Sequence, residues 1–298
     1  MWRMKQLCLL IVMLLLLSLT ACAMGTPDVT EEEYRYYLEW MALERLDVTE
    51  IGNYDDETLR QKMIAAVEQE ESYRDCLEYM LWDGFATEYL SERNMGKFSI
   101  EKLEKIAAYA FAQEEYTHTK EELKDDYQIT VPRNSTPQEI AGLYYRTLLQ
   151  QVYGFTNLED DTPWYITSEM YYLCQAVDAL QQKVGDTTVF TNATLEELQE
   201  LDRQLLADFL QQMYGIQQDI SGYTIDELEE LEIRLRLEQE ARDYGYTGDL
   251  SGYSNDELSM LGFRLAVEKD IRAAGYDGDL SRYTEEELCE LRDKLQNS

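Results

Sequence analysis

Long stretches that mix apolar with charged residues follow one another along the chain after residue 30. Good helix formers fill these stretches, and only 4 Pro and 15 Gly interrupt the 298 residues. The pattern therefore predicts an all-α fold, either a helical bundle or a stack of helical repeats. Before the C-terminal third we expect helices over residues 31–46, 56–82, 86–93, 99–124, 136–153 and 165–184.

The C-terminal third contains an internal repeat with a period of about 30 residues. Residues 222–251 and 252–281 align without a gap, and more than half of the aligned positions are identical. A more divergent copy covers residues 192–221, and a shortened copy covers residues 282–298. Such a period is typical of stacked helical units whose faces are buried by their neighbours.

The expected helices carry clear start signals. A Thr or Ser stands three residues before a Glu, which is the sequence of a capping box that satisfies the first free amides of a helix. In the repeats an apolar residue directly follows the Glu of the capping box, so the first turn of the helix is expected to pack against a neighbouring apolar residue. The pairs are Thr30 with Glu33, Thr136 with Glu139, Thr194 with Glu197, Thr224 with Glu227, Ser254 with Glu257 and Thr284 with Glu287.

The helix ends are marked as well. Glycine tolerates the left-handed conformation that closes many helices, and it stands at the expected ends. Leu250 and Leu280 lie in the linkers that follow, where they are expected to dock each linker on the core. The closing glycines are Gly154, Gly185, Gly215, Gly245 and Gly275.

The middle repeat helices show two apolar stripes on opposite sides when residues are placed at 100° intervals. Helices of this kind are expected to lie between two neighbours. In the last unit, residues 282–298, acidic and polar residues replace the second stripe, so this helix is expected to cap the stack. In the preceding helix, Leu258, Leu261 and Leu265 form one stripe, and Met260, Phe263, Val267 and Ile271 form the other.

The first residues of the chain have the order of a secretion signal. Residues 1–6 include Arg3 and Lys5, and an apolar run follows from Leu7 to Thr20. This run is shorter than the roughly 20 apolar residues that a membrane-spanning helix needs. We therefore predict that residues 1–21 are a cleavable signal peptide.

The end of this segment, Leu19-Thr20-Ala21-Cys22, resembles the lipobox of bacterial lipoproteins. The resemblance implies lipidation of Cys22 and a protein held on the outer side of the cell membrane by its lipid. Ala23 follows, and in two-membrane bacteria a residue other than Asp there usually directs the protein to the outer membrane. The alternative is ordinary cleavage after Ala23, which would release a soluble protein.

The predicted organisation has five parts. Residues 1–21 are the signal peptide, and residues 22–30 hold the lipidated Cys and a short tether. Residues 31–130 form an N-terminal helical region, residues 131–191 a middle helical region, and residues 192–298 the helical repeats with their capping helix.

The charge of the chain limits its partners. It has 26 Lys and Arg against 60 Asp and Glu, a net charge of -34. Nucleic acid binding needs a basic face and is excluded as a function class. Attraction to anionic lipid is disfavoured too, so the lipid on Cys22 must hold the protein to the membrane. A protein or peptide is the expected partner.

No residue pattern for catalysis or a cofactor stands out. His118 is the single histidine, and no nucleophile elbow, phosphate loop or zinc-ligand spacing occurs in the sequence. Cys76, Cys174 and Cys289 remain after Cys8 leaves with the signal and Cys22 is lipidated; their wide spacing predicts free thiols, or one disulfide with one free thiol. We predict neither a catalytic residue, a metal site nor a cofactor.

Two alternatives remain open beside a binding or scaffolding function. Adjacent acids could serve a cell-envelope hydrolase that works with two carboxylates. The linker Asp277 to Ser281 followed by Glu287 is similar to a calcium loop, although its last acid stands one position early. The acidic pairs are Asp55-Asp56, Asp125-Asp126 and Asp160-Asp161.

Overall fold

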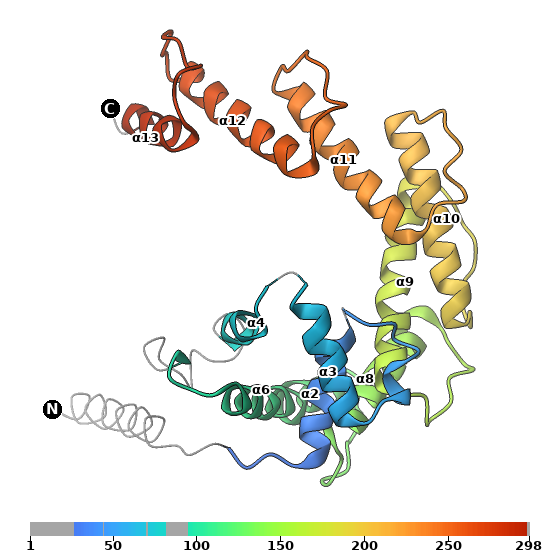
Figure 1. Cartoon of the computed structure of the whole chain (residues 1–298). Coiled ribbons are helices and arrows are strands. Elements are labelled where there is room, and N and C mark those ends of the chain that lie inside the picture. Colours follow the sequence, from blue (N-terminus) through green and yellow to red (C-terminus); the bar gives the residue numbers. More distant parts are fainter. Residues whose placement is uncertain (1–26, 44, 70, 82–94, 297–298) are drawn as a thin grey trace, which may run out of the picture. The chain divides into compact units, whose positions relative to one another are not determined.

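The computed structural model describes residues 27–43, 45–69, 71–81 and 95–296. Every regular element in these ranges is helical, which confirms the predicted all-α fold (Figure 1). No helix in the described ranges is both long and apolar enough to cross a membrane. The signal peptide, Cys22 and the helix expected at residues 86–93 lie outside the described residues.

The chain forms two compact units. Unit 1 comprises the residues up to Gln175 together with Val189–Leu198, and unit 2 comprises Ala176–Thr188 and Gln199–Ser298. The division passes through two helices, α9 (Trp164–Val184) and α10 (Leu195–Tyr214).

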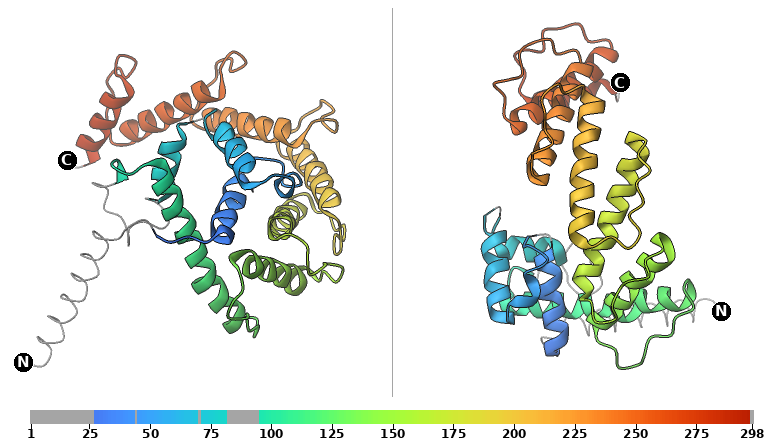
Figure 2. Two further views of the ribbon diagram at one scale, coloured as in Figure 1. Left: turned by 60° about the horizontal axis from the view of Figure 1, so that its bottom comes forward. Right: turned by 90° about the vertical axis from the view of Figure 1, so that its right-hand side faces the viewer.

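Unit 1 is built around α2 (Glu31–Leu43), which packs against α3, α6 and α8 (Figure 2). Tyr37, Leu38 and Met41 of α2 have at most 1% of their surface exposed, so this helix provides the centre of the core. The other helices of unit 1 are α3 (Asp56–Val67), α4 (Tyr73–Met80), α6 (Ile100–Glu114), a π-helical turn (Glu115–Thr119), α7 (Lys120–Asp125), α8 (Pro137–Tyr153) and the first part of α9.

The helix predicted over residues 56–82 is interrupted, so that prediction was wrong. α3 ends at Val67 and α4 begins at Tyr73. Ser72 accepts a hydrogen bond from the Asp75 amide and starts the new helix. Val67 and Tyr73 are both buried in the same core cluster, and the chain turns between them to bury both.

Unit 2 contains the repeat helices α11 (Ile225–Asp243), α12 (Asn255–Ala273) and α13 (Glu285–Gln296). Their predicted starts are confirmed: Thr224, Ser254 and Thr284 accept the amide of the Glu three residues later, and that Glu accepts the amide of the Thr or Ser. The five closing glycines have positive φ angles between 67° and 93°. Leu250 and Leu280 are buried at 2% and 3% exposure, as expected for linker anchors.

An arginine fixes each linker between repeat helices, a feature that the sequence analysis missed. Arg264 in the middle of α12 donates to the carbonyl oxygens of Leu280 and Tyr283, both at 3.0 Å. Its Nε pairs with Glu268 at 2.9 Å. The linker therefore runs back from the end of α12 to its middle, and α13 begins there (Figure 1). We call this arrangement the arginine clamp.

The same clamp occurs throughout the repeats and again in unit 1. Arg234 holds the carbonyls 16 and 19 residues later, as Arg264 does. Arg35 also holds the carbonyls 16 and 19 residues later, and Arg74 holds those 21 and 24 residues later. The repeated module therefore extends beyond the C-terminal third.

The clamp explains why the two-stripe prediction holds for only half of α12. Val267 and Ile271 of the second stripe are buried at 2% and 0% exposure, where they meet Leu280 and Leu288. Met260 and Phe263 of the same stripe are exposed at 56% and 49%, so their predicted burial was wrong. Because the next helix starts beside the middle of α12, it covers only the C-terminal half.

Candidate functional site

Exposed apolar side chains recur on the repeat helices of unit 2. Ile233 of α11 and Phe263 of α12 occupy equivalent positions of successive repeats and are exposed at 43% and 49%. Met260 lies one turn before Phe263 and is exposed at 56%. We call these three residues the repeat apolar face. The position is apolar in these two repeats, whereas Asp293 stands at the equivalent position of α13.

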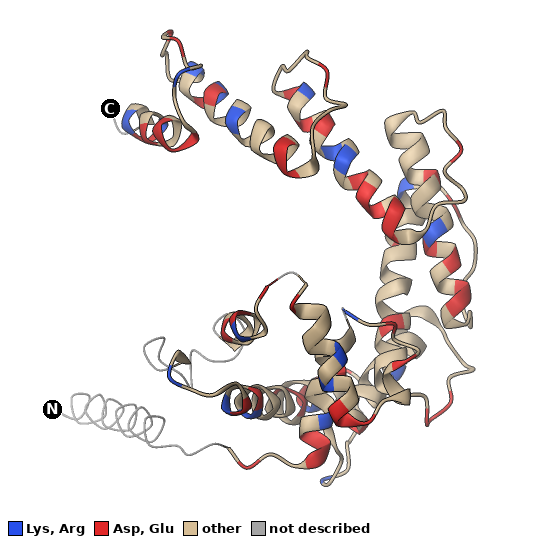
Figure 3. Cartoon of the chain, viewed as in Figure 1, with Lys and Arg blue, Asp and Glu red and all other residues tan. Residues whose placement is uncertain are grey.

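Acidic residues are frequent along α11 and α12, where basic residues also occur (Figure 3). Exposed Glu229 and Glu230 stand one turn before Ile233 on α11, and exposed Asp256 stands one turn before Met260 on α12. Glu230 and Asp256 also line a groove of about 500 Å³ between α11 and the start of α12. The surface thus combines apolar contact area with several carboxylates, and Arg234 also lines the groove.

A second hollow lies in unit 1, where a pocket of about 610 Å³ is bordered by α2, α8 and the start of α9. This volume is in the range of small-ligand sites. It is lined by Arg35, Glu39, Gly52, Gln138, Glu139, Gly142, Arg146, Asp160, Thr162, Pro163, Trp164 and Tyr165.

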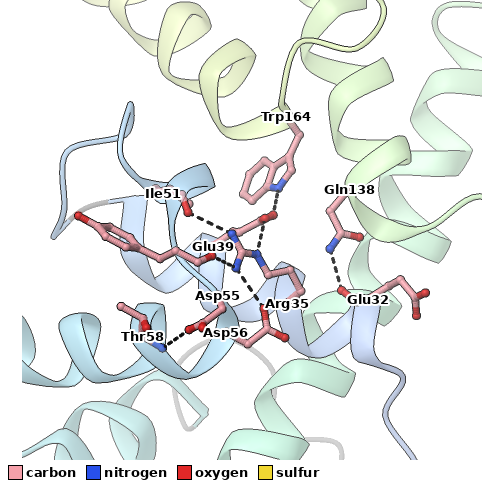
Figure 4. A network of polar contacts seen from close by, with 10 residues as sticks. Glu32, Arg35, Glu39, Ile51, Asp55, Asp56, Thr58, Gln138 and Trp164 are labelled. Atoms are coloured by element: carbon pink, nitrogen blue, oxygen red, sulfur yellow. Dashed lines mark hydrogen bonds and ion pairs between the residues drawn. The ribbon is translucent and has the colours of Figure 1, made fainter.

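The floor of this pocket is an ordered polar network (Figure 4). Arg35 forms an arginine clamp on the carbonyls of Ile51 and Tyr54, and its side chain pairs with Glu39 at 2.7 Å and Asp56 at 3.1 Å. The charge and most donors of Arg35 are therefore committed to the fold.

Glu39 joins two distant segments through this network. It accepts a hydrogen bond from the indole Nε1 of Trp164 at 2.7 Å, in addition to its bond from Arg35. Burial raises the pKa of the Glu39 carboxyl above its ordinary value, and the two donors oppose that shift. The carboxylate serves to hold α2 against the start of α9.

The first of the acidic pairs singled out in the sequence has local structural partners. Asp55 accepts the Thr58 amide as the N-cap of α3, and Asp56 pairs with Arg35. Asp125 ends α7, next to Asp126. Of the predicted pairs, Asp160-Asp161 contributes to the unit 1 pocket, through the exposed Asp160. No two of these pairs line a common pocket in the described part of the chain.

The calcium-like linker is also occupied by hydrogen bonds. Asp279 accepts the amide and the hydroxyl of Ser281, and Glu287 completes the capping box of α13. Within the described residues no group of three or more His, Cys, Asp or Glu is placed to hold a metal ion.

The single histidine and the cysteines lie apart from both hollows. His118 is in the π-helical turn, with 74% of its side chain exposed and Nε2 3.8 Å from Glu114. Cys76 and Cys174 are buried and Cys289 is half-buried, and none of the three forms a disulfide with another described residue. Burial raises the pKa of the Cys174 thiol to about 12, which keeps it protonated and unreactive.

Comparison with known proteins adds no family to this description, because no family model, curated protein or solved structure matches the chain. The function must therefore be argued from the geometry and chemistry of the chain itself.

Proposed function

We propose that this chain is a lipid-anchored extracytoplasmic binding protein whose repeats hold a cationic, amphipathic segment of a partner protein. The anchor is Cys22 of the lipobox, and the binding surface is the repeat apolar face. The observation that carries the proposal is the recurrence of exposed Ile233 and Phe263 at equivalent positions beside exposed carboxylates. An apolar stripe rimmed by acids complements a helix with one apolar and one basic face.

The net charge of -34 favours the same partner. A field of one sign attracts a basic segment from a distance and repels an acidic one, so it sets the rate of encounter and the choice of partner. Contact with the apolar face then supplies binding free energy through burial of Ile233, Met260 and Phe263. Screening by salt should weaken the electrostatic attraction and leave the contribution of apolar burial unchanged.

A synthetic Lys/Leu amphipathic helix is the probe for this surface. We expect saturable binding to the purified full chain, and we expect Phe263→Asp to weaken it about tenfold or more, since that change removes apolar area and places a charge in the contact. Fluorescence anisotropy at low and moderate salt measures the affinity. Val152→Asp, at another exposed apolar site with 57% exposure, is the matched control and should leave the affinity unchanged.

Equal affinity of Phe263→Asp and Val152→Asp for the probe would show that contact with Phe263 contributes nothing to binding. Equal binding of a Glu/Leu amphipathic helix would contradict charge complementarity. Either result would remove the proposed surface.

The anchor is tested separately. Cys22→Ala should abolish incorporation of a labelled fatty acid. The variant should either accumulate as unprocessed precursor or be released from the membrane, because the acidic body has no attraction of its own for anionic lipid. Metabolic labelling followed by fractionation measures both effects. Cys289→Ala is the control and should keep the label. Wild-type protein that takes up no fatty acid would disprove lipidation and leave the binding surface unaffected.

A further inference from the structure

The guanidinium of Arg146 borders the unit 1 pocket with most of its donors uncommitted. Arg146 lies on α8 and is half-buried. Among the described residues its hydrogen bonding is limited to the Thr162 carbonyl, at a long 3.4 Å from Nη1. A guanidinium has five N–H donors, so most of them face the pocket or solvent without a protein acceptor.

Arg146 differs in this respect from other half-buried arginines of the chain. In a protein with such an excess of acid, a half-buried arginine normally finds a carboxylate, and no carboxylate in the described ranges lies within ion-pair distance of Arg146. The half-buried arginines that pair with a carboxylate at 2.6 to 2.9 Å are Arg35, Arg60, Arg74, Arg203, Arg234 and Arg264.

Two glycines leave room for the guanidinium of Arg146 and for the ring of Tyr165, because they have no side chain. A Cβ on Gly142 would lie 3.1 Å from Nη1 of Arg146 and 3.5 Å from the Cβ of Trp164. A Cβ on Gly52 would lie 2.5 Å from the hydroxyl of Tyr165. Any larger residue at these positions would displace the side chains that line the pocket.

Of the two arginines that line the pocket, only Arg146 has no carboxylate partner among the described residues, although Glu139 and Asp160 also line it. Arg35 is neutralised by Glu39 and Asp56, as described above. Glu139 accepts the Thr136 amide in the capping box of α8. Asp160 is exposed at the pocket edge, so a dianion such as phosphate would meet two nearby acids while gaining a single guanidinium. A monoanion suits this balance better.

We propose that the pocket binds the C-terminal carboxylate of a peptide, with the guanidinium of Arg146 as the bidentate hydrogen-bond donor. The planar guanidinium matches a carboxylate with two parallel hydrogen bonds. Trp164 and Tyr165 line the pocket but are only 4% and 7% exposed, so they offer the last side chain a small apolar contact. Gln138 lines the same pocket, and its Oε1 has no partner in the described structure. Because this oxygen is buried, the amide must turn toward the pocket before it can accept the last peptide N–H of the ligand.

Calorimetric titration with acetylated tripeptides tests this assignment on the purified full chain. The series ends in Ala, Leu or Phe, and each peptide is used as the free acid and as the C-terminal amide. We expect saturable binding of at least one free acid, and about tenfold or weaker binding of its amide, because the amide loses the charge-assisted pair. Inorganic phosphate should bind more weakly than the best free acid.

Three variants locate the site. Arg146→Gln should weaken binding of the free acid about tenfold or more, and Arg146→Lys should restore part of it, since an ammonium keeps the charge and loses the planar fork. Arg133→Gln removes the same charge at an exposed position outside the pocket and should change nothing. If Arg146→Gln proves unfolded by circular dichroism, Gly142→Ala gives the same test, because its methyl group crowds the guanidinium.

Equal binding of acid and amide, equal binding by wild type and Arg146→Gln, tighter binding of phosphate, or no binding in the whole series would each overturn the proposal. All of the residues involved belong to unit 1, whereas the repeat apolar face belongs to unit 2. Failure of one proposal therefore leaves the other standing.

Discussion

Replacing Leu258 with Ala is expected to lower the free energy of unfolding of the repeats by about 2 to 5 kcal/mol. Leu258 is fully buried, and it packs in one cluster with Leu237 and Ala241 of α11 and with the linker anchor Leu250. Removing its side chain leaves a cavity where a helix, a linker and the next helix meet. Neighbouring atoms held by the arginine clamp cannot easily collapse into that cavity.

Met260→Ala is the matched control for this prediction. Met260 lies two residues further along α12 and is 56% exposed, so its replacement should cost less than about 0.5 kcal/mol. Hydrogen exchange with mass spectrometry, read on peptides from residues 225–296, measures the effect in unit 2 directly. Equal loss of protection in the two variants would mean that α12 is sandwiched on both sides along its whole length, as its sequence pattern alone suggests.

Replacing Glu104 with Ala should destabilise unit 1 by about 3 to 5 kcal/mol, the cost typical of breaking a buried charged pair. Glu104 of α6 is 2% exposed, and its Oε1 accepts hydrogen bonds from Arg60 of α3 at 2.7 Å and Tyr73 of α4 at 2.8 Å. Tyr73 also lies 2.9 Å from the hydroxyl of Tyr37 on α2. The Glu104 carboxylate therefore joins α6 to α3 and α4 directly, and to α2 through Tyr73.

Burial also raises the pKa of the Tyr73 hydroxyl well above its ordinary value, so it remains a neutral donor to Glu104. Without the carboxylate, the Nε of the partly exposed Arg60 would lose its acceptor in the protein, and the buried Tyr73 hydroxyl would keep only the Tyr37 hydroxyl as a partner. Denaturant unfolding followed by circular dichroism measures the loss.

Glu101→Ala on the same helix provides the comparison. Glu101 pairs with Lys105 at 3.0 Å, but 77% of its side chain is exposed, so its removal should cost at most about 1 kcal/mol. A Glu104 variant as stable as the Glu101 variant would show that the buried network contributes nothing to the fold of unit 1.

The sequence predicted the helices best where a local signal starts or ends them. A capping box involves only four consecutive residues, and a closing glycine acts through its own φ angle, so both can be recognised without knowing the fold. Thr224, Ser254 and Gly245 illustrate this. The break before Ser72 was missed, because the cap there competes with helix-forming neighbours and burial of Val67 and Tyr73 decides the outcome.

The candidate sites depended far more on tertiary structure. Arg146 and Trp164 are separated from Glu39 by more than 100 residues of sequence, and nothing in their local context marks them as pocket residues. The arginine clamp could have been found from the sequence as an Arg placed before an apolar residue and an aromatic residue at fixed intervals. That signal was visible in the repeats, but its meaning is a contact with linker carbonyls, which the sequence does not show.

The sequence by itself determined the helical class, the repeat period, the helix ends and the acidic charge, because each depends on residues close in the chain or on composition alone. The tertiary structure alone decided which apolar residues are buried and which acids are held by arginines. Phe263 and Val267 lie on the same predicted stripe, yet only Val267 is covered, since the returning linker starts the next helix beside the middle of α12. The point at which one helix begins against another is a long-range property, and it sets where the protein keeps a free surface.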